Sequence, residues 1–385
     1  METVQTLLDR QLADDRFPGA VALVARIDNV DFGCAGARTL GQAPMTRDTL
    51  FRVASLTKPI LAAVTMVLIE RGHLRLDDTV DGWLPELAHP VVMRDLLGSI
   101  DDVVPAERAI TVRDLLTLQS GHGFPPDFDP PVVQLLMSDL FQGPALPQAV
   151  PPPDEWMARL ARIPLLHQPG KGWTYNTGSD ILGVLLARLE AAPLPDVFTD
   201  TVLGPLAMSD TGFAVRPDDI VRLASAYRRD GSGGFALVDP PEGDWTSLPV
   251  FAAGSGGLVS SADDLLTFQR MLLADGEFEG ARVLSPESVR LMTSSQVEAE
   301  PGNPLLQGQG WGFGGSVDLD RSDPWNVPGR YGWVGGSGTA AYIYPRSGAA
   351  SIWLSQVELQ GPDDFSGMAE FLTYAAQPDA VARLV

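Results

Sequence analysis

The chain has 385 residues, of which 45% are hydrophobic, and its 27 basic and 49 acidic side chains give a formal net charge of −22. This length is enough to bury a large core, in one large domain or in two interleaved domains. We expect neither nucleic acid nor a membrane as a partner, because phosphate groups and anionic lipids repel an acidic surface.

The N-terminal segment, residues 1–10, predicts an amphipathic acidic helix. It lacks the basic start and the unbroken apolar core of a signal peptide. No apolar run in the sequence is long enough to span a membrane. Cys34 is the only cysteine, which excludes an internal disulfide. We therefore expect a cytoplasmic protein.

Two short strands are expected after this helix, at Ala20–Arg26 and Val30–Gly33, joined across Asp28–Asn29. The long apolar run from Pro59 to Arg71 then predicts a helix, which Gly72 ends. This run begins directly after the first motif that carries chemistry.

The middle of the chain is predicted to be mostly helical. Thr111–Asp114 has the pattern of a capping box, and Ser179–Glu190 predicts a long helix. The segment Gly123–Pro153 is Pro-rich with few periodic apolar residues, so we expect a long loop there. Ser261–Asp264 has the pattern of a second capping box, and Ser285-Pro286 predicts another helix start.

Strands return near the C-terminus. Thr339–Tyr344 and Ala350–Ser355 predict a hairpin across the turn 345–348, and a last helix is expected from about Asp363 to Tyr374. Strands at both ends of the chain predict a single sheet built from both ends.

This pattern predicts an α+β fold with an antiparallel sheet flanked by helices. We expect one domain formed by residues 1–75 and 251–385, and a mostly helical inserted domain at residues 76–250. An active site is expected in the cleft between the two parts.

The first chemical motif is Ser55-Leu56-Thr57-Lys58, at the start of the apolar helix. Residues three apart on a helix share a face, so the Ser55 hydroxyl and the Lys58 amine can meet. A serine becomes a nucleophile when a neighbouring base takes its proton, and a lysine can assist. Taken alone, a motif of this kind more often marks a capping serine followed by a solvated lysine.

Two further motifs follow. A turn places Tyr175 directly ahead of the helix at Ser179. The Tyr175 hydroxyl can share a proton with Lys58, or it forms a hydrogen bond with the backbone. The glycine-rich segment Gly332–Thr339 approaches a strand and can offer N–H groups to a substrate carbonyl, or it is a turn or bulge.

These three motifs, in this order and spacing, resemble those of the serine β-lactamase and penicillin-recognising superfamily. The pattern is most similar to class C β-lactamases, related D-Ala-D-Ala peptidases and family VIII carboxylesterases. Further similar stretches follow the first helix and include Ile110–Gly121 and Gly254–Asp264, so the resemblance covers nearly the whole chain. The implied fold is the β-lactamase/transpeptidase fold.

The resemblance implies that Ser55 is the nucleophile, that Lys58 assists its deprotonation, and that Tyr175 is the general base and acid. The implied oxyanion hole is the N–H of Ser55 and that of Gly336, or of Ser337 if the register differs by one residue.

Two departures from the family pattern bear on the substrate. Thr177 stands where lactamases carry an asparagine, and the segment Trp333-Val334-Gly335 stands where they carry Lys-Thr-Gly or His-Thr-Gly. We expect these four residues to contact the substrate. A tryptophan presents an apolar wall and a single donor, which suits a neutral ester better than an anionic amide.

The leading hypothesis is a serine carboxylesterase that acts on short-chain or aromatic esters through an acyl-enzyme. The alternatives are a β-lactamase or a D-amino-acid peptidase or amidase with the same nucleophile, and an inactive binding protein on this scaffold. The sequence contains no G-x-S-x-G elbow, H-E-x-x-H pair or nucleotide loop, so no cofactor and no metal are expected. The oligomeric state is open. His122 is either at the cleft mouth or structural.

Overall fold

A computed structural model describes residues 2–26, 29–125, 130–143, 145–297, 303, 305–306, 308–361, 364–365 and 367–377. Its centre is a seven-stranded antiparallel sheet in the order β11-β12-β13-β14-β15-β1-β2. The strands are β1 (Gly19–Arg26), β2 (Asn29–Gly36), β11 (Gln309–Trp311), β12 (Ser316–Asp318), β13 (Tyr331–Gly335), β14 (Thr339–Tyr344) and β15 (Ala349–Ser355). Leu23 of β1 lies opposite Ile352 of β15. This pairing confirms that both ends of the chain build one sheet.

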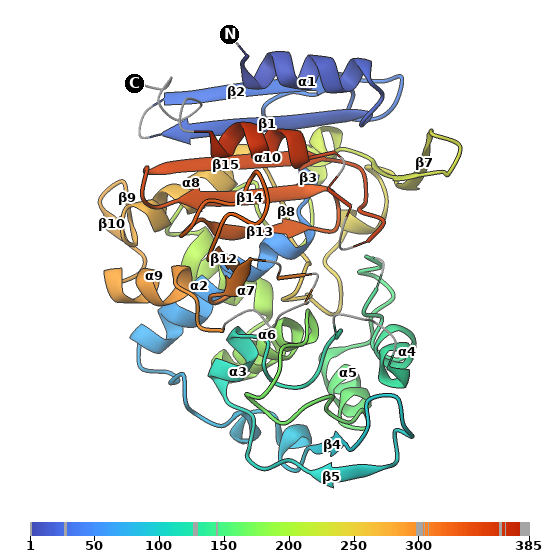
Figure 1. The fold of residues 1–385 in the computed structure, drawn as a ribbon, viewed down its shortest axis with the longest axis vertical. Helices are drawn as coiled ribbons and strands as arrows, with labels where there is room; N and C mark the ends of the chain where they lie inside the picture. The colour runs from blue at the N-terminus through green and yellow to red at the C-terminus, as the bar shows by residue number, and fades with distance from the viewer. Residues whose placement is uncertain are drawn as a thin grey trace.

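The sheet is the middle of three layers (Figure 1). Side chains on a strand alternate between its faces, so Val21 and Leu23 enter one core while Ala22 and Val24 enter the other. The helices α1 (Val4–Ala13) and α10 (Ala369–Ala376) cover the face of Ala22 and Val24. The opposite core contains α2 (Thr57–Glu70) and α8 (Ala262–Leu273). The α+β prediction is therefore confirmed.

The regular elements in the middle of the chain are mostly helices, as predicted, and α3 to α5 lie at the end of the molecule away from the sheet (Figure 1). Its helices are α3 (Val112–Leu116), α4 (Pro131–Ser138), α5 (Pro153–Leu160), α6 (Thr177–Glu190) and α7 (Leu194–Phe198). Two short ladders accompany them, β4 (Val91–Met93) with β5 (Val103–Pro105) and β6 (Ala226–Arg229) with β7 (Phe235–Asp239).

The domain boundaries at residues 75 and 250 stay a prediction. The β6–β7 ladder falls within the predicted insert, yet it is hydrogen bonded to the segment after β15, where Tyr227 N donates to Gln356 O at 2.8 Å. The remaining strands and α-helix are β3 (Phe51–Arg52), β8 (Val259–Ser260), β9 (Glu277–Phe278), β10 (Ala281–Arg282) and α9 (Pro286–Thr293).

Most of the predicted helix starts are confirmed at the level of single hydrogen bonds. Thr111 and Asp114 form a reciprocal capping box at α3, and Ser285 caps α9. At α8, Ser261 accepts from Asp264 N at 3.3 Å, but the Asp264 carboxylate accepts from Asp210 N instead of completing the box. The hairpin of β14 and β15 is also confirmed.

Two local predictions are wrong. The segment Gly123–Pro153 is not one long loop, because α4 buries Val132, Val133 and Leu136 on one face of two helical turns. The last helix begins at Ala369, after Met368 at its N-cap, and not near residue 363. Asp363 itself, like Met1 and Asp28, lies outside the described residues.

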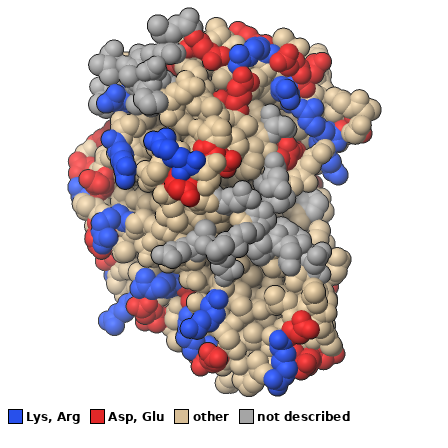
Figure 2. Space-filling view, in the orientation of Figure 1, with Lys and Arg blue, Asp and Glu red and all other residues tan. Residues whose placement is uncertain are grey.

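Charged side chains are dispersed over the surface. Figure 2 shows acidic and basic side chains beside one another around one face of the molecule, with mostly uncharged residues between these groups. Arg222, for example, bonds to Asp210 at 2.5 Å and to Asp219 at 3.0 Å. Such pairs neutralise charge locally, whereas the chain as a whole keeps its net charge of −22.

His122 is a structural residue rather than part of the cleft mouth. Its ring is 3% exposed, and Nε2 lies 3.1 Å from the carbonyl oxygen of Ile163. Burial lowers the pKa of His122 from 6.5 to about 4. The folded protein therefore holds the imidazole neutral at pH values where the unfolded chain protonates it.

This difference makes His122 a source of acid sensitivity. As the pH falls from 6.5 to 4, the unfolded state binds a proton that the folded state does not, so the free energy of unfolding falls. We expect that His122→Gln removes this loss, so that between pH 7 and pH 4.5 the variant gains about 2 kcal/mol relative to wild type. Urea unfolding of both proteins at the two pH values measures the shift. A difference that stays constant with pH would contradict the assignment.

Candidate active site

The structure brings Ser55, Lys58 and Tyr175 together. Ser55 lies in a short 3-10 helix, Ala54–Leu56, between β3 and α2, and Lys58 lies in the first turn of α2. Lys58 Nζ is 3.0 Å from Ser55 Oγ, and the Tyr175 hydroxyl is 2.9 Å from the same oxygen. Both distances are within the reach required for proton transfer. The tyrosine is 120 residues further along the chain.

Two strained turns hold this arrangement. Ala54, directly before Ser55, has φ +44°, and Asn176, directly after Tyr175, has φ +81° and ψ −67°. The second is a γ-turn, in which Thr177 N donates to Tyr175 O at 3.2 Å. Non-glycine residues in such conformations are uncommon and cluster at functional sites. The sequence predicted a turn beside Tyr175, but it did not predict the positive φ of Ala54 or of Asn176.

Lys58 is 1% exposed and fully hydrogen bonded. Besides Ser55 Oγ, its Nζ donates to Asn176 Oδ1 at 2.8 Å and to the Ser255 carbonyl oxygen at 2.7 Å. It also lies 4.6 Å from the centre of the Tyr175 ring. Sequence reasoning noted the missing amide at position 177 but overlooked Asn176, which supplies an amide to Lys58 from the adjacent position.

Trp333 contacts Tyr175 instead of forming a substrate wall. Its Nε1 donates to the Tyr175 hydroxyl at 2.6 Å, and its ring packs edge-on against Trp311 with the ring centres 4.8 Å apart. The indole is 4% exposed. The structure thus differs from the prediction, because on β13 this side chain faces the large core rather than open space.

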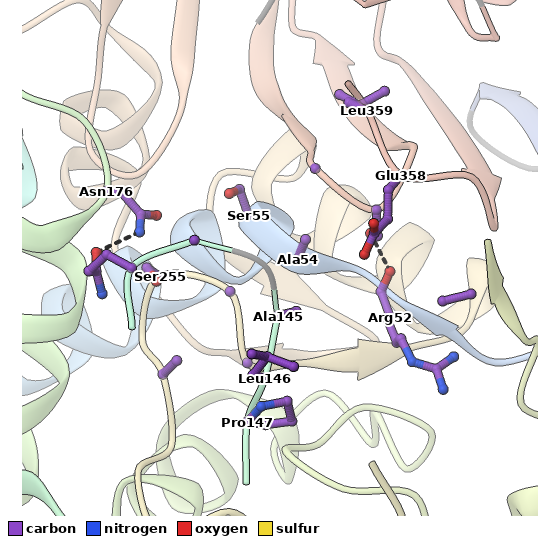
Figure 3. Close-up of a pocket in the computed structure, with 18 of the residues that line it drawn as sticks. Arg52, Ala54, Ser55, Ala145, Leu146, Pro147, Asn176, Ser255, Glu358 and Leu359 are labelled. Atoms are coloured by element: carbon purple, nitrogen blue, oxygen red, sulfur yellow. Dashed lines mark hydrogen bonds between the residues drawn. The ribbon is translucent and has the colours of Figure 1, made fainter. Parts of the chain in front are cut away.

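A cavity of about 720 Å³ opens in front of Ser55. Figure 3 shows Ser55 and Ala54 between Asn176 on one side and Arg52 and Glu358 on the other. Tyr175, Gly336 and Ser337 also border the cavity. Most of the wall is apolar and is formed by Phe124, Met137, Leu140, Phe141, Leu146, Val150, Trp245, Phe251 and Leu359.

The charged groups on the wall of this cavity are already paired. The guanidinium of Arg52 bonds to Asp239, and Arg228 lies 3.5 Å from Glu358. Thr177 is completely buried behind the wall, where its hydroxyl donates to Gln142 Oε1 at 3.1 Å. Its placement also differs from the predicted substrate contact.

The end of β13 forms the edge of the cavity beside the nucleophile. A Cβ added to Gly335 would lie 2.5 Å from Val53 O, so glycine permits the strand to approach the segment that carries Ser55. Val334 packs against the core, whereas a Cβ added to Gly336 would meet nothing within 4 Å. Gly336 therefore borders open space, and its carbonyl oxygen is held by Leu359 N at 2.8 Å.

Among the described residues, no cluster of three or more His, Cys, Asp or Glu side chains is arranged to hold a metal ion. Within the same residues, no helix has the length and apolarity needed to cross a bilayer.

The sequence pattern of the family named Beta-lactamase matches residues 4–372. The chain belongs to the beta-lactamase family. A Mycobacterium tuberculosis (strain ATCC 25618 / H37Rv) protein named Rv1367c is 41% identical over 327 residues, covering 81% of this chain and 79% of that protein. Esterase EstB of Burkholderia gladioli is 29% identical over 411 residues, covering 99% and 95%.

A solved structure supports the same grouping. EstCE1, described as a hydrolase with promiscuous acyltransferase activity, superposes with a TM-score of 0.77 at 27% identity and covers 96% of each chain. The family resemblance and the β-lactamase/transpeptidase-like fold predicted from the sequence are thereby confirmed. The protein is an esterase-like member of the serine hydrolases and acyltransferases that share this fold.

Proposed function

We propose that this protein is a carboxylesterase that acts on short-chain or aromatic esters through an acyl-enzyme on Ser55. The observation that carries the proposal is the Ser55 hydroxyl, which is hydrogen bonded to both Lys58 and Tyr175 at the edge of an apolar cavity. A nucleophile within hydrogen-bond reach of its base, with the base oriented by a further group, is the arrangement that covalent catalysis requires. Trp333 orients the tyrosine.

In the first half-reaction, Ser55 Oγ attacks the ester carbonyl carbon while its proton passes to the Tyr175–Lys58 pair. The carbonyl oxygen becomes an oxyanion, which the N–H groups of Ser55 and Gly336 stabilise. The pair then returns the proton to the leaving alcohol as the C–O bond breaks, and the acyl group remains on Ser55.

In the second half-reaction, water takes the place of the alcohol. The Tyr175–Lys58 pair accepts a proton from the water as its oxygen adds to the acyl carbon, and then returns the proton to Ser55 Oγ. The carboxylic acid leaves and the resting enzyme is restored. An alcohol in place of water gives acyl transfer, and the volume of about 720 Å³ provides room for such a second organic molecule.

The cavity favours a neutral ester over a β-lactam. A β-lactam carries a carboxylate, and a charge-assisted hydrogen bond to it contributes roughly 1.5–3 kcal/mol. On this wall, Arg52 and Arg228 are both engaged by acidic side chains. The lysine or histidine that lactamases place in the third motif is Trp333 here, and its only N–H is directed at Tyr175.

We therefore expect kcat/KM for p-nitrophenyl acetate to exceed that for nitrocefin by roughly 10²-fold or more. Initial rates on p-nitrophenyl acetate, p-nitrophenyl octanoate and nitrocefin, measured side by side, test this ratio. Equal kcat/KM for p-nitrophenyl acetate and nitrocefin would contradict the esterase hypothesis and support the β-lactamase alternative. No turnover of any ester, β-lactam or D-amino-acid amide would support the inactive binding protein.

A further inference from the structure

The position of Lys58 is determined by two groups that can only accept hydrogen bonds. Asn176 Oδ1 and the Ser255 carbonyl oxygen receive two of the Nζ hydrogens, at 2.8 and 2.7 Å. The remaining tetrahedral direction of Nζ points to Ser55 Oγ at 3.0 Å. The residues that fix these two acceptors therefore also fix the distance and direction from Lys58 Nζ to Ser55 Oγ.

Hydrogen bonds connect both acceptor residues to one buried carboxylate, that of Asp180 on α6. Ser255 donates to it twice, through its N–H at 2.8 Å and its Oγ at 2.9 Å. On the other side, Asn176 Nδ2 donates to Gln142 Oε1 at 2.8 Å, and Gln142 Nε2 donates to Asp180 Oδ2 at 2.5 Å. The hydrogen bonds form a closed ring that starts and ends at Lys58 Nζ.

The carboxylate gives this ring its direction. An ionised carboxylate accepts only, so Gln142 must turn its NH₂ group toward Asp180 and its oxygen toward Asn176. Asn176 must then donate its NH₂ to Gln142, which leaves its oxygen facing Lys58. Without an obligate acceptor at position 180, either amide can turn over and present an NH₂ group to the lysine.

Asp180 accepts hydrogen bonds at both carboxylate oxygens, although its burial opposes ionisation. Its side chain is 1% exposed, and burial raises the pKa of the carboxyl group. Hydrogen bonds from Gln142 and Ser255 and the charge of Lys58 act in the opposite direction. Three donors converge on the two carboxylate oxygens, which is the pattern of a satisfied buried anion.

We propose that Asp180 is a positioning residue for Lys58, fixing the direction of the Asp180–Gln142–Asn176 hydrogen bonds and the place of the Ser255 carbonyl oxygen. The carboxylate does not react with the substrate. Its effect reaches the reacting atoms through the lysine, so the inference rests on the proposed role of Lys58 in activating Ser55.

Asp180→Asn tests this directly, because asparagine keeps the size of the side chain but can donate toward Gln142. We expect the acylation rate in the stopped-flow burst with p-nitrophenyl acetate to fall roughly 10- to 100-fold, with the substrate dissociation constant changed less than about twofold. Gln142→Met, which interrupts the ring while leaving Asp180 and Ser255 paired, is expected to slow acylation in the same way.

A second substitution separates positioning from packing. In the Asp180→Asn background, Gln142→Glu restores an obligate acceptor for Asn176 Nδ2 and lets the new asparagine donate to the new carboxylate. We expect the double variant to acylate roughly tenfold faster than Asp180→Asn. Gln142→Glu alone places two carboxylates together and is expected to lower Tm. A residue that only fills space would show no such recovery.

Asp264→Asn is the matched control. Asp264 is a half-buried aspartate that also accepts from a backbone N–H and a hydroxyl, but it lies on α8 and bonds to Asp210 and Thr211. The acylation rate of the Asp264→Asn variant is expected to equal that of wild type, with any effect confined to Tm. Wild-type acylation in Asp180→Asn or in Gln142→Met overturns the inference, and so does a double variant no faster than Asp180→Asn. If Ser55→Ala stays active, the proposed function itself fails.

Discussion

Replacement of Ser55 by alanine is expected to reduce ester hydrolysis below a hundredth of the wild-type rate and to abolish covalent labelling by a phosphonate. The reason is chemical: Ser55 Oγ is the atom on which Lys58 and Tyr175 converge, so its removal leaves no acceptor for the acyl group. The stability cost is small, since the alanine side chain fits any site that holds a serine. Steady-state rates and intact-protein mass spectrometry after labelling measure the two effects.

Ser347→Ala, in the turn between β14 and β15, is the control for this experiment and is expected to retain full activity and labelling. Circular dichroism of both variants checks that the fold is intact. Labelling of Ser55→Ala at the wild-type stoichiometry, or activity above a hundredth, would show that another residue is the nucleophile.

The parts of this site that the sequence predicted are those set by local geometry or by a resemblance that spans the chain. Ser55 and Lys58 are three residues apart at a helix start, so their proximity follows from helical geometry alone. Tyr175 is different. No local pattern relates it to Ser55, and only the order and spacing of three motifs linked them before the structure placed their oxygens 2.9 Å apart.

The orientation of the third motif was beyond the sequence. A strand shows which residues alternate, but which face meets the site depends on the register and on the neighbouring layer. On β13, Trp333 turns toward Trp311 and Tyr175, and the open edge begins only at Gly336. The tryptophan therefore acts on the tyrosine rather than as the apolar wall that was expected.

The buried ring around Lys58 was equally hidden. Gln142, the start of α6 with Asn176 and Asp180, and Ser255 belong to three separate segments, and each residue taken alone fits a loop or a helix surface. Gln142 in particular follows α4, within the segment predicted to be a long loop. Long-range contacts of this kind depend on tertiary packing, which a single sequence does not specify.

Tyr175→Phe and Lys58→Ala are expected to reduce the acylation rate by roughly 10²–10⁴ each, the usual scale for loss of a general base. Phenylalanine keeps the ring that packs against Trp173, Trp311 and Trp333, but removes the oxygen that joins Ser55 to the Trp333 indole. Alanine at position 58 removes the amine and leaves the Asn176 and Ser255 oxygens without their donor.

The double variant provides the sharper result. Lys58 and Tyr175 both contact Ser55 Oγ, and Lys58 Nζ lies over the Tyr175 ring. Removal of either group therefore impairs proton transfer by the other. Residues that act as one proton-transfer unit are strongly non-additive. We therefore expect the double variant to be slower than the worse single variant by less than about tenfold. Stopped-flow acylation of the four proteins, with thermal melts to confirm folding, completes the cycle. Losses that simply multiply would mean that the lysine and the tyrosine assist Ser55 in separate steps, and the shared-proton mechanism would have to be abandoned.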